Sequence, residues 1–288
     1  MKKEVEEEHG YPYDPVKYKI NSIQNWNTVA PGYIETGPAR EGARSGQLSS
    51  LSKLQTSGWS MVLDVACGTG VVSMQVAQLR GPPGMLVGID FSRGALNIAR
   101  SSVPTGHFVE MDAENIGFEL KFNRIVCQYA LMFFPEPEQV LRRLWTLLKN
   151  GDKLAIAVHW TPEGVPYFNT VMRPVLRYKP DIRPEGTPTV HRFGSRTDLQ
   201  RIIASARFSK ISIEEFVYEY EAGTFEEYWS DYMSTTANSI RAIIESKGAG
   251  VLSAIKAESE TKAQKFVKGG NILFPWQVLI ATAIQAQN

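Results

Sequence analysis

Three aspartates follow short apolar runs in the first half of the chain, where a carboxylate could bind a ligand. Asp64 stands in the run MVLDV, Asp90 ends the run MLVGID, and Asp112 follows HFVEM. If these runs are neighbouring strands of a parallel sheet, the three acids meet at its carboxyl edge, the usual binding crevice of such sheets. Carboxylates there can accept hydrogen bonds from ribose hydroxyls and attract a positively charged ligand.

A turn of small residues follows the first acid, in the string LDVACGTG that ends at Gly70. Small residues let the backbone approach a ligand closely, and a helix beginning after Gly70 would offer unpaired N–H groups. The turn lacks the third glycine of GxGxxG, and a pyrophosphate is disfavoured beside three acids. A dinucleotide-dependent oxidoreductase is therefore disfavoured. Two cysteines and four scattered histidines form no recognisable metal site.

Elements of alternating type must position these acids. Helical patterns are expected at 71–80, at 92–100 after a capping Ser92, and from Pro137 to a stop at Asn150-Gly151. Between them lie five strand-like runs, at 61–65, 85–89, 107–111, 124–128 and 154–160. This alternation predicts an α/β fold, with a parallel sheet and helices on both of its faces.

The flanking segments are less regular. Residues 1–20 are typical of a mobile arm, and 21–57 of a short helix and a lid. The proline-rich segment 161–194 is predicted to be irregular. Further elements are predicted as a helix after Ser195, a strand at 211–220, helices over 225–268 opened by a Thr224–Glu227 capping box, and a strand at 273–284. The expected division is an arm and lid at 1–57, a cofactor-binding core at 58–160, and a cap with the remaining helices and strands at 161–288.

The string DVACGTG, followed by GID and MDAE, resembles the class I S-adenosylmethionine-dependent methyltransferases. The block CQYALMFFPEPEQVLRRLWTLLKNGDKLAIAVHW is similar to the ubiquinone/menaquinone-type small-molecule branch of that family. The resemblance is strong over about 61–160, and HRFGSRTDLQRIIASARF and FPWQVLIATA extend it. It implies a Rossmann-like, seven-stranded, mostly parallel sheet with helices on both faces and a helical cap insertion. The cofactor it implies is S-adenosylmethionine, with S-adenosylhomocysteine as the product.

The resemblance also implies roles for individual residues. Asp90 would bind both ribose hydroxyls, Phe91 would pack on the adenine, and Asp112 would accept from the adenine amino group beside the Ala113 backbone. Ala66 and Asn123 depart from the glycine and aspartate common in relatives. The methionine end of the cofactor would lie beside Asp64, Ala66, Cys67, Gly68, Gly70 and, after the fourth strand, Gln128.

Methyl transfer from sulfur is an in-line displacement, so the enzyme mainly aligns the reactants and excludes water. A base is needed only where the acceptor still holds its proton. His159 and His191 are the candidate bases, and each has a structural or substrate-orienting role as its alternative. His107 and His9 are discounted by position. Cys67 and Cys127 are predicted to be buried thiols and not nucleophiles.

The predicted activity is methyl transfer to a small organic acceptor, with O- or C-methylation favoured by the resemblance. One alternative is a protein that binds the same cofactor but catalyses another reaction, such as a cyclisation. A non-catalytic binding module on the same fold is the other. QYAL stands where nucleobase amine methyltransferases carry Asn/Asp-Pro-Pro-Tyr/Phe, so that substrate class is disfavoured.

Composition excludes several broad classes of protein. The chain has 288 residues, 43% of them hydrophobic, and a net charge of +1, which argues against disorder and against nucleic-acid binding. The charge-free C-terminal stretch 269–288 is interrupted by polar residues, so a buried strand is favoured over a membrane span. We expect a cytoplasmic monomer or homodimer whose partner is a small-molecule substrate. The chain has nine basic residues within 173–210 and seven acids within 214–231. One interpretation is that these segments form two solvated faces that pair with each other. The alternative is that an arginine binds an anionic group of the substrate, the candidates being Arg173, Arg177, Arg183 and Arg192.

Overall fold

An eight-stranded sheet runs through the computed structural model, which describes residues 12–33, 61–78 and 84–285. The order of the main strands is β3-β2-β1-β4-β5-β8-β6, with β7 paired to β8. Strands β1 to β5 are mutually parallel, and β8 runs antiparallel to both β5 and β6. The strands are β1 (Met61–Val65), β2 (Met85–Asp90), β3 (His107–Glu110), β4 (Phe122–Gln128), β5 (Leu148–His159), β6 (Ser209–Gly223), β7 (Val267–Lys268) and β8 (Asn271–Ile284).

Helices cover both faces of the parallel part of the sheet. One face packs on α3 (Val71–Gln78) and α4 (Arg93–Ser102), and the other on α5 (Pro137–Leu147) and α7 (Arg196–Ser205). Successive strand residues serve opposite faces because side chains alternate along a strand. Val62 of β1 accordingly belongs to the first core, and its neighbour Leu63 to the second.

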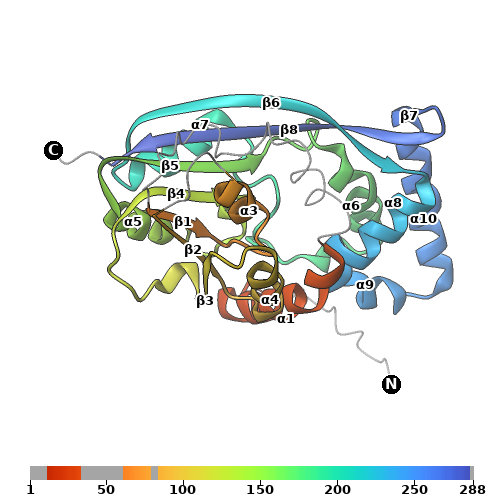
Figure 1. Cartoon of the computed structure of the whole chain (residues 1–288). Coiled ribbons are helices and arrows are strands. Elements are labelled where there is room, and N and C mark those ends of the chain that lie inside the picture. The colour runs from red at the N-terminus through yellow and green to blue at the C-terminus, as the bar shows by residue number, and fades with distance from the viewer. Residues whose placement is uncertain (1–11, 34–60, 79–83, 286–288) are drawn as a thin grey trace, which may run out of the picture.

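The strands β6 and β8 continue beyond the end of β5 and form a two-stranded ribbon that carries the cap (Figure 1). The cap core gathers buried aromatic side chains, among them Tyr167, Tyr228 and Trp276. The Tyr228 hydroxyl donates to the Tyr167 carbonyl at 2.6 Å. The cap helices are α6 (Pro166–Tyr178), α8 (Phe225–Asp231), a π-helical turn (Tyr232–Thr236), α9 (Asn238–Glu245) and α10 (Ala249–Ala263), with short 3-10 turns at Pro180–Ile182 and Gln264–Phe266.

The N-terminal helix α1 (Pro15–Tyr33) lies beside α4 and reaches toward α9 (Figure 1). Its Asn27 Oδ1 accepts from the Gly94 N–H at 2.9 Å and from the Ser92 hydroxyl at 3.0 Å, so it covers the beginning of α4. Its Asn25 Oδ1 accepts from Asn238 Nδ2 at 2.9 Å. Helix α1 is therefore bonded both to the sheet domain and to the cap.

The predicted α/β architecture, a mostly parallel sheet with helices on both faces and a helical cap, is confirmed. The described residues contain eight strands and not seven because the two-residue β7 pairs with β8. The capping residue Ser92 accepts from the Ala95 N–H, and the Thr224–Glu227 capping box is complete. The boundaries at 57 and 160 stay a prediction. The predicted lid at 34–57 and residues 79–80 of a predicted helix lie outside the described residues.

Three local predictions were wrong. The supposed arm already contains the start of α1, because the Asp14 carboxylate accepts from the Val16 and Lys17 N–H groups and Pro15 fits the first helical position. The segment 161–194 is not irregular throughout, since α6 begins at Pro166 and buries Val171 and other apolar residues.

The helix after Pro137 ends at Leu147, before the predicted stop, and residues 148–150 already belong to β5. Leu148 is buried and pairs with Phe122, so its side chain serves the sheet core. Pairing with a distant strand therefore ends the helix, which the local sequence did not predict.

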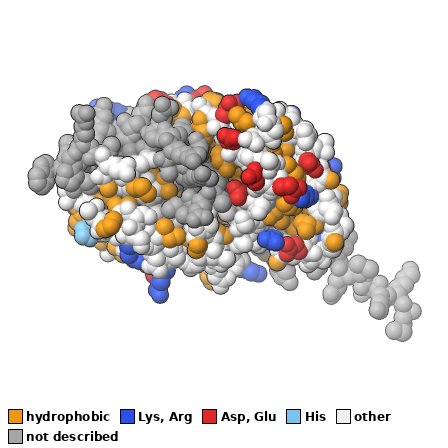
Figure 2. Space-filling model, turned by 45° about the vertical axis from the view of Figure 1, so that its right-hand side comes forward, with side chains coloured by type: hydrophobic (Ala, Val, Ile, Leu, Met, Phe, Trp, Pro, Cys, Tyr) orange, Lys and Arg blue, Asp and Glu red, His pale blue; other side chains and the backbone are white. Residues whose placement is uncertain are grey.

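Charged and apolar side chains share the surface. On the face in Figure 2, Asp and Glu side chains gather toward one side, and hydrophobic side chains lie between them in small groups. Scattered exposed apolar residues of this kind are normal for folded proteins. Within the described part of the chain, no helix has the length and apolarity needed to cross a bilayer.

Packing around Phe108 gives a test of the sheet. A β-carbon at Gly88 would lie 2.6 Å from the Phe108 ring and 2.9 Å from Cys67 Sγ. We predict that Gly88→Ala lowers the free energy of unfolding by about 1–3 kcal/mol, because the core must be overpacked. Gly117→Ala is the control, since nothing lies within 4 Å of its β-carbon. Urea unfolding measures both, and equal stabilities would contradict this packing.

Candidate functional site

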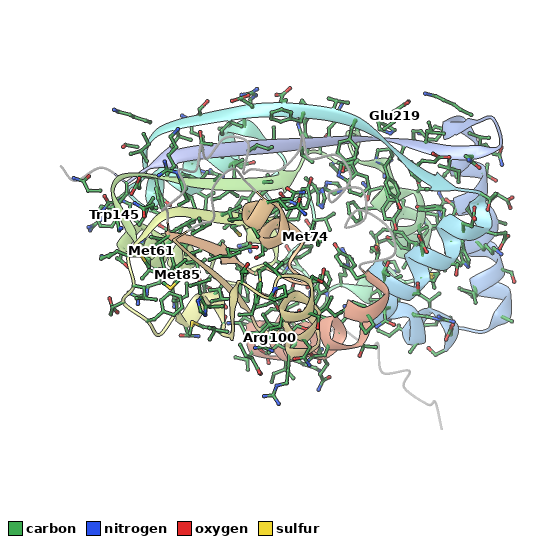
Figure 3. All side chains as sticks on the ribbon, viewed as in Figure 1. Met61, Met74, Met85, Arg100, Trp145 and Glu219 are labelled. Carbon is green, nitrogen blue, oxygen red and sulfur yellow. The ribbon has the colours of Figure 1, made fainter. Side chains whose placement is uncertain are left out.

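The carboxyl ends of β1 to β5 meet at one edge of the sheet and bring most of the predicted site residues together. Met61 and Met85, which begin β1 and β2, lie at the opposite edge, away from the cap (Figure 3). The carboxyl edge therefore faces toward the cap helices (Figure 1). Any ligand held by the strand ends would lie between the sheet and the cap.

The turn after β1 has the unusual backbone that its small residues allow. Ala66, Gly68 and Gly70 all have positive φ, at 53°, 54° and 86°. Positive φ is costly for alanine, and such strain is common at ligand sites. At Gly70 a β-carbon would also lie 3.0 Å from that of Ala99, so glycine lets α3 and α4 approach closely. The Cys67 N–H donates to the Ile89 carbonyl at 3.0 Å, which ties the turn to β2.

Asp64 lies almost entirely inside the protein, with 1% of its surface exposed. Its Oδ2 accepts from the Ser73 hydroxyl of α3 at 2.6 Å. Burial raises the pKa of Asp64 to about 7, the Ser73 hydrogen bond opposes that rise, and the nearby Asp90 carboxylate adds to it. Near neutral pH this carboxyl group is therefore poised between its neutral and charged forms.

Asp90 ends β2 and is held by backbone donors. Its Oδ2 accepts from the Gly68 N–H at 2.9 Å, and its Oδ1 from the Ser92 N–H at 2.8 Å. Burial raises the pKa of Asp90, and these hydrogen bonds offset part of the rise. The Phe91 N–H also acts on this carboxylate, and since a carboxylate has about four acceptor positions, capacity remains for a ligand. Phe91 follows it, half-buried.

Asp112 follows β3 and carries a contact that the sequence did not suggest. Lys19 of α1 donates to its Oδ2 at 2.8 Å, and the same lysine also pairs with Glu114. Burial alone would raise the pKa of Asp112, but the Lys19 hydrogen bond and the Glu114 N–H bond lower it. Ala113 is buried next to it at the start of a 3-10 turn (Ala113–Asn115). The third acid is thus present at the edge, already paired with α1.

Gln128 and Tyr129 stand at the end of β4. The Gln128 Oε1 atom is buried and has no hydrogen-bond partner. Tyr129 has a φ of +55°, which is rare for an aromatic residue, and its N–H donates to the Ala157 carbonyl at 2.9 Å. Strained residues therefore end both β1 and β4, on the two central strands of the crevice.

Aromatic rings surround His159 at the end of β5. The ring stacks on Tyr129, with centroids 4.4 Å apart, and contacts Phe168 at 5.1 Å and Trp276 at 5.4 Å. Burial lowers the pKa of His159 to about 3, and nearby His191 lowers it further, so this imidazole is neutral at physiological pH. His159 Nδ1 and Trp276 Nε1 are buried without hydrogen-bond partners. These side chains are packed on one another, and we use the name aromatic chamber for this cluster of Tyr129, His159, Phe168, His191 and Trp276.

His191 reaches this chamber from the segment between α6 and α7. Its ring lies edge-on to Phe168, with centroids 6.0 Å apart. Its Nδ1 lies 2.6 Å from the Trp160 carbonyl oxygen, and its Nε2 is buried without a partner. Burial lowers the pKa of His191, although the Trp160 carbonyl and Glu163 oppose that effect. Both candidate histidines are therefore brought near each other at the carboxyl edge.

Other predicted groups lie elsewhere or have no reactive character. His107 is exposed at the beginning of β3, far from the carboxyl edge, and His9 lies outside the described residues. Cys67 and Cys127 are free and buried, and burial raises the pKa of the Cys127 thiol to about 12 and that of Cys67 well above its usual value. No trio of His, Cys, Asp or Glu side chains within 12–33, 61–78 and 84–285 could hold a metal ion.

Pairing between the basic and acidic segments is limited. Arg196 of the basic segment pairs with Glu215 of the acidic segment at 2.6 Å. Arg173 and Arg177 pair instead with Glu163 and Glu258, outside the acidic segment. Arg192 donates to the Phe134 carbonyl at 2.7 Å, whereas Arg183 has no hydrogen bond or ion pair with any described residue.

Sequence reasoning missed Lys19, Asn27, Tyr129, Phe168 and Trp276. Lys19 contacts Asp112 across 93 positions of the chain, and no local pattern predicts so distant a partner. The aromatic residues were visible only as apolar positions of strands and helices. A polar atom on an apolar strand, such as the imidazole of His159 or the indole N–H of Trp276, was the available signal.

Comparison with known proteins agrees with this geometry. Residues 62–151 match a family described as a methyltransferase domain. A demethylmenaquinone methyltransferase of Listeria welshimeri is 32% identical over 123 residues, which are 41% of this chain and 52% of that protein. The chain thus spans about half the length of the curated relatives it matches.

Solved structures resemble a larger part of the chain. Phosphoethanolamine N-methyltransferase 2 of Haemonchus contortus, in complex with phosphomonomethylethanolamine and S-adenosylhomocysteine, has a TM-score of 0.56 at 15% identity, over 93% of this chain and 59% of that one. The cyclase SpnF has a TM-score of 0.54 at 14% identity, over 96% of this chain and all of that one, 100%. At these identities the structures show a shared fold.

The buried imidazole at the end of β5 predicts a pH-dependent stability. The pKa of His159 is about 3 in the folded chain, and about 6.5 for an exposed histidine. The unfolded chain therefore binds a proton that the folded chain does not, and the stability contributed by neutral His159 is lost as the pH falls below about 6.5. Between pH 7 and pH 5 this residue should cost about 2 kcal/mol of unfolding free energy.

Urea unfolding at both pH values, of the wild type and of His159→Gln, measures this difference. The variant should lose about 2 kcal/mol less than the wild type on acidification. His107→Gln, which removes an exposed histidine, should behave like the wild type. A wild type and a His159→Gln variant with the same pH dependence would show that His159 is not held neutral.

Proposed function

We propose that this chain, whose residues 62–151 match a methyltransferase domain, is a class I methyltransferase that transfers the methyl group of S-adenosylmethionine to a small organic acceptor. The observation that carries this proposal is the carboxyl edge, where Asp64, Asp90 and Asp112 surround a turn with exceptional backbone geometry. Buried carboxyl groups with raised pKa values favour a positively charged ligand, because its charge offsets their desolvation. The sulfonium cofactor of this family is such a ligand.

The nucleoside half of the cofactor would be held by the ends of β2 and β3. Asp90 would accept from the ribose hydroxyls with its remaining acceptor capacity, and Phe91 would pack on the adenine. The Ala113 backbone and Asp112 would meet the adenine edge. Because Lys19 already donates to Asp112, the adenine amino group would share this carboxylate with the lysine.

The methionine half would lie over the turn after β1. Asp64 would supply negative charge, and Gln128 would offer its unpartnered Oε1 from the end of β4. The turn would contribute backbone atoms that a ligand can approach closely. These atoms belong to Ala66, Cys67, Gly68 and Gly70. Tyr129, the first residue after β4, belongs to the aromatic chamber. An acceptor bound at the chamber would therefore lie beside the methyl group.

The chamber supports O- or C-methylation of an acceptor with an apolar body. Its walls are aromatic, and His159 is neutral there at physiological pH. Such a surface suits a planar, uncharged ring, whereas a phosphate group would lose its hydration without a positively charged partner. The relatives named demethylmenaquinone methyltransferases also favour this choice.

A second candidate is a reaction that uses the bound cofactor without transferring its methyl group. Nearly the whole chain is similar in fold to the cyclase SpnF. This similarity supports the second candidate, because the fold alone does not separate the two activities. We further propose a cytoplasmic location, because both cysteines are free thiols. A monomer or homodimer, without a nucleic-acid partner, remains part of the proposal.

Turnover assays decide between these functions. The protein is incubated with methyl-labelled S-adenosylmethionine and a panel of hydroxylated aromatic, quinol and amine compounds. Methyl transfer predicts labelled acceptor and S-adenosylhomocysteine in equal amounts. Conversion of an acceptor without S-adenosylhomocysteine would favour the second candidate, and binding of cofactor with no conversion of any compound would favour a binding module.

The ribose role of Asp90 gives a separate prediction. Asp90→Ala should weaken S-adenosylmethionine binding by about tenfold to a hundredfold, because charge-assisted hydrogen bonds to the ligand are lost. Glu110→Ala is a matched control, because Glu110 pairs with Asp90 in the sheet register but is exposed and bonded to Arg93. Calorimetry measures both affinities, and a retained affinity in Asp90→Ala would remove the residue from the proposed site.

A further inference from the structure

We propose that His191 is the general base of this methyl transfer and takes the proton of an acceptor hydroxyl at its Nε2 atom. The inference rests on the proposed function, which leaves the base unassigned. His191 has two ring nitrogens, of which one contacts a backbone carbonyl and the other has no hydrogen-bond partner.

The hydrogen bond of His191 fixes its tautomer. Its Nδ1 lies 2.6 Å from the Trp160 carbonyl oxygen. A carbonyl oxygen can only accept, so Nδ1 must carry a hydrogen and donate it. In the neutral ring the lone pair is then on Nε2, which is buried and unpartnered. A base needs this arrangement, with one nitrogen held by the protein and a lone pair on the other that no described protein group uses.

The surrounding chain holds this ring in place. The Gly194 N–H donates to the His191 carbonyl at 3.0 Å, and a β-carbon at Gly194 would lie 2.7 Å from the Trp160 oxygen. Arg192 donates to the Phe134 carbonyl at 2.7 Å, which ties the next residue to the loop after β4. The turn that carries His191 is therefore packed against the carboxyl ends of both β4 and β5.

The His191 ring belongs to the aromatic chamber. Phe168 lies edge-on to it and contacts both His159 and Trp276. Tyr129 stacks on His159, with centroids 4.4 Å apart. Because Tyr129 follows Gln128, which is predicted to face the methionine end of the cofactor, an acceptor bound against this cluster would lie near both the methyl group and His191.

His159 is the other candidate and is unsuited to the role. The pKa of His159 is about 3. Its imidazole is therefore too weak a base to take a proton from a hydroxyl near neutral pH. Its stacking on Tyr129 and its burial make it part of the chamber wall. His191 is buried less completely, and the Trp160 carbonyl stabilises its protonated form.

The charged and titratable groups that act on His191 come from several elements. Glu163, in the segment before α6, stabilises the imidazolium, whereas Arg183, after α6, and His159 of β5 disfavour it. Burial outweighs the favourable groups and leaves the pKa of His191 below its usual value. The ring is thus neutral, and able to accept a proton, at pH 7.

The acceptor O–H bond breaks and its proton moves to Nε2, while the electron pair left on oxygen forms the new bond to the methyl carbon. The methyl–sulfur bond breaks, and its pair stays on sulfur as the neutral thioether of S-adenosylhomocysteine. For methylation at a ring carbon, the pair acts through the conjugated ring and the proton on that carbon is then lost to water. The imidazolium returns its proton to solvent.

Kinetics with a hydroxylated acceptor from the turnover panel test the proposal. His191→Gln should lower kcat/KM by about 10²–10⁴-fold at pH 7, the usual contribution of a general base. The ratio of wild-type to variant kcat/KM should become smaller at high pH, because the acceptor hydroxyl then ionises without a base. His107→Gln should leave kcat/KM unchanged, and calorimetry should give His191→Gln the wild-type affinity for S-adenosylmethionine. A loss that is the same at every pH, or a variant with full activity, would overturn the proposal.

A second measurement needs no acceptor and separates failure of this inference from failure of the proposed function. In protein labelled with ¹⁵N-histidine, the signals absent from His191→Gln identify His191. Nuclear magnetic resonance at pH 7 should show a proton on Nδ1 and none on Nε2. A ring that carries its proton on Nε2, or on both nitrogens, would overturn the proposal whether or not the protein transfers methyl groups.

Discussion

Two carboxyl groups at neighbouring strand ends, one buried and one partly buried, constrain the whole site. Asp64 is buried and Asp90 is partly buried, both have raised pKa values, and the charge of Asp90 raises the pKa of Asp64 further. Removing two carboxylates from water is costly unless each is hydrogen-bonded or meets positive charge. Ser73, Gly68 and Ser92 supply hydrogen bonds, but no cationic side chain is bonded to either acid among the described residues. The cationic cofactor of the proposed function would supply what this edge lacks.

Helix α1 and the cap complete the surroundings of that edge. Lys19 bonds Asp112 beyond β3, Asn27 covers the start of α4 immediately after Asp90, and Asn25 bonds Asn238 of the cap. One helix thus connects the expected adenine end of the crevice with the cap that holds the aromatic chamber. The long ribbon of β6 and β8 brings Trp276 to the same place from the other side (Figure 1).

The sequence predicted what is decided locally or by repeated pattern. Alternating apolar runs gave the parallel sheet, and capping residues such as Ser92 and Thr224 marked helix starts within a residue. Three acids after successive strands converge because parallel strands end at one edge. The contact of Lys19 with Asp112 could not be predicted, because it depends on how α1 docks. The early end of α5 at Leu147 was missed for a similar reason, as pairing of Leu148 with Phe122 overrides local helix preference.

The central claim is that a positively charged nucleoside sits against the buried Asp64 carboxyl, and proton release on binding tests it most directly. Free Asp64 has a pKa of about 7, and adjacent positive charge must lower it, so the ligand displaces a proton. Calorimetry of S-adenosylmethionine binding at pH 6.5, in buffers of different ionisation enthalpy, should show net proton release. The affinity should rise with pH up to about 7 and then level off, and Asp64→Asn should abolish both effects. Binding without proton release, equally tight from pH 5 to pH 8 in both proteins, would contradict the account.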